Sequence, residues 1–124
     1  MDLVCWMAEF AKVLASAATL VHKDPAPYLQ LYEKYLQTLE LHWDQSRELY
    51  SDIAEYNEQN IKYVRHIGYV SLFPLLSGVI PADSPRLKSI LDIIQDENQL
   101  WTKFGLRSLS ASDPYYLKCK GIRY

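Results

Sequence analysis

The sequence predicts an all-α fold of about four helices in antiparallel pairs, followed by a C-terminal loop. Two observations lead to this prediction. Apolar residues recur at steps of three and four in four separate segments, and prolines mark the turns between those segments. The chain has 124 residues, of which 49% are hydrophobic and 23% charged, so it is long enough for one globular domain.

The first helix is expected over about residues 2–21, because this stretch is rich in alanine and contains no glycine or proline. Its predicted apolar stripe consists of Leu3, Trp6, Met7, Phe10, Val13, Leu14, Ala17 and Val21. Asp24-Pro25-Ala26-Pro27 ends this helix and opens a second one, expected over about 26–43. The short joint between them predicts an antiparallel helical hairpin.

Residues 46–63 are polar and weakly patterned, and we expect a solvated helix face or a loop there. Ser71 is expected to cap a third helix that runs to about Ile80, and Ser84 with Pro85 to begin a fourth that ends near Asn98. The periodicity stops at residue 100, so a loop should follow. The residues expected to be most buried are Leu72, Phe73, Leu76, Leu87, Leu91 and Ile94.

Charge and cysteine usage exclude several classes of function. The net charge of −2 and the pI near 5.9 do not favour binding to nucleic acid or to an anionic membrane surface. We expect no targeting signal and no membrane segment, because charges interrupt the N-terminus and no basic region precedes an apolar one. Cys5 and Cys119 fit no metal-binding spacing, so the sequence predicts no metal and no cofactor.

Three stretches carry a resemblance to a known family. They are Asp2-Leu3-Val4-Cys5-Trp6, the block Val64–Leu76 that contains Gly-Tyr-Val-Ser-Leu-Phe-Pro, and Leu100–Ser110 with the following Asp113-Pro114-Tyr115-Tyr116. In this order they resemble the catalytic domain of glycoside hydrolase family 63, the mannosyl-oligosaccharide glucosidases. Residues 1–116 are therefore expected to be part of such a domain, and residues 117–124 to be a divergent tail.

The resemblance implies a fold, an activity and a location. The family's catalytic domain is an (α/α)6 toroid, of which this chain would form a part. The family is an inverting α-glucosidase that removes the terminal α-1,2-linked glucose from N-glycan precursors in the endoplasmic reticulum. An oligosaccharide substrate and localisation to the endoplasmic reticulum are thus expected by resemblance.

The resemblance also implies site residues. Asp2 matches the family's general acid, and Trp6, Phe104, Arg107 and Ser108 are expected to bind substrate. From the residues alone, the favoured interpretation of Asp2 is a helix cap and not a catalytic group, and Arg107 could equally be a loop-packing residue. The family's base is a glutamate further downstream than this chain reaches. The carboxylates of the chain that could replace it by chemistry are Asp44, Asp52, Glu97 and Asp113, and nothing in the sequence chooses among them.

We therefore predict a fragment of a family 63 α-glucosidase that is inactive alone. The alternative is a small α-helical interaction or regulatory protein without catalysis, and a third reading is an unrelated helical bundle whose match is accidental. A third of a toroid would leave apolar helix faces open, so self-association is also expected.

Overall fold

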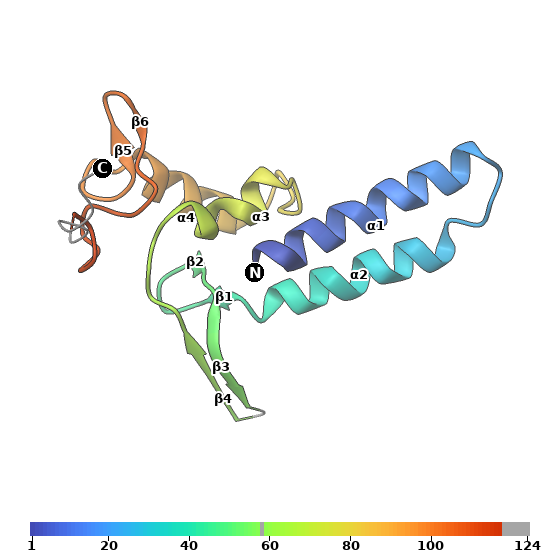
Figure 1. Cartoon of the computed structure of the whole chain (residues 1–124), viewed down its shortest axis with the longest axis horizontal. Helices are drawn as coiled ribbons and strands as arrows, with labels where there is room; N and C mark the ends of the chain where they lie inside the picture. The colour runs from blue at the N-terminus through green and yellow to red at the C-terminus, as the bar shows by residue number, and fades with distance from the viewer. Residues whose placement is uncertain (58, 118–124) are drawn as a thin grey trace, which may run out of the picture.

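Two long helices form an antiparallel pair that extends away from the rest of the molecule (Figure 1). The computed structural model describes residues 1–57 and 59–117. Helix α1 spans Asp2–Leu20 and helix α2 spans Ala26–Glu40, joined by a short turn that contains Asp24 and Pro25. The predicted hairpin of the first two helices is thus confirmed.

The contact face of α1 differs from the prediction. The residues of α1 that are buried are the small ones: Cys5, Ala8, Ala11, Ala15 and Ala18. Most large apolar residues of the predicted stripe point outward, and Leu3 and Trp6 are 68% and 63% exposed, whereas Met7 and Leu14 are half-buried. Small side chains allow two helices to approach closely. Because α1 is apolar on most of its surface, periodicity alone could not identify the face that packs.

The prediction of an all-α fold is wrong, because the described residues contain three two-stranded antiparallel sheets beside the helices. The fold is mixed α/β and replaces the all-α partial toroid of the prediction. The sheets pair β1 (Trp43–Asp44) with β2 (Leu49–Tyr50), β3 (Ile53–Asn57) with β4 (Asn60–Tyr63), and β5 (Trp101–Thr102) with β6 (Gly105–Leu106).

The β3–β4 hairpin has a physical basis in the stretch predicted to be a solvated helix or loop. Ile53 lies opposite Tyr63, and Tyr56 lies opposite Ile61, so β-branched and aromatic residues form cross-strand pairs. At the turn, the Asn57 side-chain oxygen accepts the N–H of residue 59. Cross-strand pairing therefore decides the conformation of this polar segment.

The segment that follows is shorter and less regular than predicted. A 3₁₀ turn, η1 (Tyr69–Leu72), leads into a single helical turn, α3 (Phe73–Leu76), instead of a helix that continues to residue 80. Gly78, with a φ of 68°, takes the left-handed conformation just after this turn. Helix α4 spans Pro85–Gln95, and its predicted start is confirmed because the Ser84 hydroxyl accepts the Arg86 N–H at 3.3 Å.

The core lies where α1, α2, η1 and α4 converge on β2. Its fully buried aliphatic residues include Leu49, Ile90 and Leu100. Of the residues predicted to be most buried, Leu72 is 2% exposed, whereas Leu76 and Leu91 are exposed on the surface. The remaining three, Phe73, Leu87 and Ile94, are partly buried.

Within the described part of the chain, α1 is the one helix whose length and composition would allow it to cross a membrane. It lies near the N-terminus, and core helices of globular proteins meet the same criteria. In this fold its alanine face packs against α2. Of the predicted tail, residues 118–124 lie outside the described residues.

Candidate functional site

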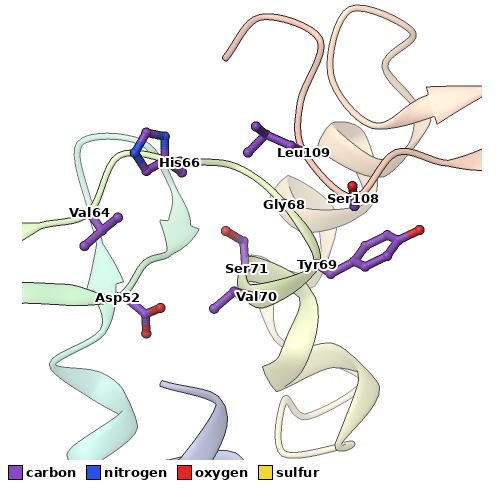
Figure 2. Close-up of a pocket in the computed structure, with 9 residues that line it drawn as sticks. All are labelled: Asp52, Val64, His66, Gly68, Tyr69, Val70, Ser71, Ser108 and Leu109. Atoms are coloured by element: carbon purple, nitrogen blue, oxygen red, sulfur yellow. The ribbon is translucent and has the colours of Figure 1, made fainter. Parts of the chain in front are cut away.

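A cavity of about 210 Å³ lies between the β3–β4 hairpin, the η1 turn and the C-terminal segment (Figure 2). Its lining combines polar and apolar side chains, as a small-ligand site requires. The lining residues are Asp52, Val64, His66, Gly68, Tyr69, Val70, Ser71, Ser108 and Leu109. Six of these nine come from the predicted family block over residues 64–76, and two from the block over residues 100–110.

Two chain segments far apart in sequence form one wall of this cavity. The Tyr69 N–H donates to the Ser108 carbonyl at 3.2 Å, and the Ser110 N–H donates to the Ile67 carbonyl at 2.8 Å. Gly68 lies between these bonds, and a Cβ on it would approach the Ser108 carbonyl to well under 3.0 Å. Gly68 is extended, with a φ of −166°, so close approach and not unusual backbone conformation requires glycine here.

The floor of the cavity meets the start of α1. Asp52 lines the cavity, and its carboxylate accepts a hydrogen bond from the charged α-ammonium group of Met1 at 2.7 Å, which makes the contact an ion pair. Asp2, the predicted general acid, is the next residue, and its Oδ1 lies 3.8 Å from the same nitrogen. Asp2 Oδ1 also accepts the N–H of Leu3 at 2.8 Å. Asp2 therefore directly follows the residue that Asp52 contacts, and it is not among the residues that line the cavity.

The carboxylate of Asp113 contacts His66, which lines the cavity. His66 Nδ1 lies 2.7 Å from Asp113 Oδ2, while Asp113 Oδ1 accepts the Tyr115 N–H at 2.8 Å. Burial of the Asp113 carboxyl favours its neutral form, but the hydrogen bonds from Tyr115 and His66 outweigh that effect. They hold the pKa of Asp113 below its ordinary value. The ionised Asp113 thereby fixes the His66 ring at the edge of the cavity.

Of the four residues predicted to bind substrate, Ser108 lines the cavity. Phe104 lies at the tip of the β5–β6 hairpin and is 88% exposed. Trp6 lies on the outer face of α1, with its ring edge-on to Phe73 at 6.3 Å, and lines a separate apolar groove of about 560 Å³.

Arg107 forms hydrogen bonds that hold the β5–β6 hairpin to the residues before and after it. Its Nη1 donates to the carbonyls of Glu97 and Trp101, and its Nε donates to the Tyr116 hydroxyl at 3.2 Å. These contacts correspond to the loop-packing role that was left open from the sequence. Binding of a sugar by this guanidinium remains a prediction.

The sequence reasoning did not assign Asp52, His66 or Ser71 to a site. His66 and Ser71 lie within the Gly-Tyr-Val-Ser-Leu-Phe-Pro block or just before it, so the block itself was the available signal. Asp52 stood among four carboxylates that chemistry alone could not rank. The structure distinguishes Asp52 from the other three by its contact with Met1, which is 51 positions away in sequence. Within residues 1–57 and 59–117, no group of three or more metal-ligating side chains comes together.

Comparisons with known proteins agree on one family. The model described as the glycosyl hydrolase family 63 C-terminal domain matches residues 1–122. The chain is 41% identical over 118 residues to a probable mannosyl-oligosaccharide glucosidase of Schizosaccharomyces pombe. The aligned region covers 93% of this chain and 15% of the relative.

Two further relatives are more distant. The mannosyl-oligosaccharide glucosidase of Saccharomyces cerevisiae is 28% identical over 122 residues, which cover 94% of this chain and 15% of that protein. Alpha-glucosidase 2 of Arabidopsis thaliana is 36% identical over 104 residues, which cover 77% of this chain and 13% of the relative. The chain thus spans about 15% of the length of the first two relatives.

Proposed function

Because the chain belongs to glycosyl hydrolase family 63, we propose that it forms part of the catalytic domain of an inverting α-glucosidase. The proposed reaction is removal of the terminal α-1,2-linked glucose from an N-glycan precursor, with the endoplasmic reticulum as its location. The match over residues 1–122 is the observation that carries this proposal. The cavity supports it, because Asp52 in its lining contacts Met1, the residue before the Asp2 that resembles the family's acid.

We assign Asp2 as the general acid, which would donate a proton to the oxygen of the departing sugar. An inverting glycosidase also needs a second carboxylate that activates water from the opposite side of the sugar ring. We expect this base to come from a glutamate outside the 124 residues of this chain. On this proposal the isolated chain has no turnover, since general acid catalysis without an activated water completes no hydrolysis.

The residues proposed to bind sugar lie on α1 and in the segment that contains and follows the β5–β6 hairpin. Ser108 lines the cavity, and the exposed Phe104 ring offers a face on which a pyranose can stack. Through its bonds to backbone carbonyls, Arg107 holds the β5–β6 hairpin, which carries Phe104 and directly precedes Arg107 and Ser108. Trp6 would contact substrate only in the assembled domain, because here it faces the apolar groove beside α3.

The exposed face of α1 is proposed to drive self-association of the isolated chain. Leu3, Trp6, Phe10 and Val13 are each more than half exposed and follow one another at steps of three and four. Such a continuous apolar stripe on one helix favours burial against another apolar surface.

A chimera tests the proposed activity. Residues 1–122 of this chain would replace the matching segment of the S. pombe relative, and hydrolysis of an α-1,2-linked glucose disaccharide would be measured. The chimera should be active, its Asp2→Asn variant should lose about 10²–10⁴-fold in kcat, and the isolated chain should be inactive. Turnover by the isolated chain would refute the need for an outside base, and an active Asp2→Asn chimera would refute the role of Asp2.

A further inference from the structure

Asp52 is held rigidly at the point where the cavity meets α1. It immediately precedes β3, its carbonyl accepts the Val64 N–H at 2.7 Å, and the preceding Ser51 N–H donates to the His42 carbonyl at 2.8 Å. The first bond closes the base of the β3–β4 hairpin and the second closes the base of the β1–β2 hairpin, so Asp52 lies at the junction of the two hairpins. Figure 2 shows the Asp52 side chain pointing toward the start of α1, and its carboxylate contacts the Met1 nitrogen at 2.7 Å.

The Met1 nitrogen stands at the first turn of α1, where the Cys5 N–H donates to the Met1 carbonyl at 3.2 Å. Because Asp2 follows Met1 directly, the bond from Asp52 restrains the position of the helix end that carries Asp2. In a longer chain the same nitrogen would be a peptide N–H, which still donates a hydrogen bond.

Asp52 is poorly placed to be the base. The Oδ1 atoms of the two residues lie 2.7 Å and 3.8 Å from one nitrogen, so their separation cannot exceed the sum of these distances. That sum only reaches the lower limit of the separation of about 6.5–9.5 Å that leaves room for water in an inverting enzyme. The Asp52 oxygen is also occupied by its bond to Met1.

We propose that Asp52 is a positioning residue, which tethers the first turn of α1 and so holds the Asp2 carboxylate beside the cavity. This inference rests on the proposed role of Asp2 as general acid. Catalytic groups must be held within about 0.5 Å of the productive geometry, so loss of such a tether is costly even where the fold survives.

The test uses the chimera with two substrates that differ in leaving group. Fluoride departs from α-glucosyl fluoride with little protonation, whereas the sugar of an α-1,2-linked disaccharide needs the general acid. Asp52→Ala should lower kcat on the disaccharide about 10–100-fold, with KM little changed, and kcat on the fluoride less than about 3-fold. Asp52→Asn keeps an oxygen acceptor and should retain more disaccharide activity than Asp52→Ala. The matched control is Asp83→Ala, at an exposed aspartate in the turn before α4.

Amide hydrogen exchange on the isolated chain gives a second readout that needs no activity. The Cys5 amide should exchange at least about 5-fold faster in Asp52→Ala than in Asp83→Ala. Equal exchange in the two variants, or equal loss on both substrates, would overturn the positioning role. If instead Asp2→Asn stays active on the disaccharide, the proposed function fails, while the exchange measurement still decides whether Asp52 holds the helix end.

Discussion

Replacement of Gly68 by alanine should separate the two segments that build the cavity wall. The added Cβ would clash with the Ser108 carbonyl, which is backbone and cannot rotate away. Ordinary contact of about 3.5 Å would require the segments to move apart by about 1 Å. Such a movement weakens the bonds from Tyr69 to Ser108 and from Ser110 to Ile67.

The magnitude follows from these losses. Overpacking costs about 1–3 kcal/mol, and each weakened hydrogen bond about 1 kcal/mol. We expect Gly68→Ala to lower the free energy of unfolding by about 3–5 kcal/mol, measured by urea denaturation. Amide exchange at Tyr69 and Ser110 should accelerate along with it, which locates the effect at the cavity wall.

Gly78 provides the matched control. Its φ of 68° lies in the left-handed region, and a Cβ there would meet nothing within 4 Å. At Gly78, asparagine should be tolerated better than alanine, because asparagine adopts this conformation more readily. At Gly68, asparagine should be no better than alanine, since the obstacle is steric. A Gly68→Ala variant within about 0.5 kcal/mol of the parent would refute the reasoning.

Three further predictions concern stability and association. Arg107→Lys should lower stability by about 1–3 kcal/mol in thermal melts, because one ammonium cannot replace both the Nη1 bonds to the backbone carbonyls and the separate Nε bond to the Tyr116 hydroxyl. An unchanged melting temperature with lower chimera activity would favour the sugar-binding role instead. Burial lowers the pKa of His42 and outweighs its hydrogen bond to the Ser51 carbonyl. The unfolded chain then binds the proton more readily, so stability should be full above about pH 6.5 and fall below it, and His42→Gln should flatten this dependence in urea titrations. In sedimentation the isolated chain should be larger than a monomer. Phe10→Lys should shift it toward monomer more than the control Tyr56→Lys, since Tyr56 is an exposed aromatic residue on β3 and not on α1. A sharp monomer of the parent chain would contradict self-association through the exposed face of α1.

The long helices were predictable because their signals are local. Alanine-rich composition, Pro25 and Pro27 around the first joint, and the Ser84–Pro85 start each act within a few residues, and all appear in the structure. The three motif blocks also sufficed to identify the family that the comparisons show. The short strands escaped prediction since strands of two to five residues carry too few positions for a periodicity.

The amino-acid sequence by itself determined the helical hairpin, the start of α4 and the family to which the chain belongs. Tertiary structure alone decided which face of α1 is buried, since a helix apolar on most sides has several candidate faces and α2 packs on the one lined by alanine. It also singled out Asp52 among the four carboxylates. A hydrogen bond between residues 51 positions apart depends on how the β1–β2 hairpin folds back to the start of α1, and no local pattern encodes that distance.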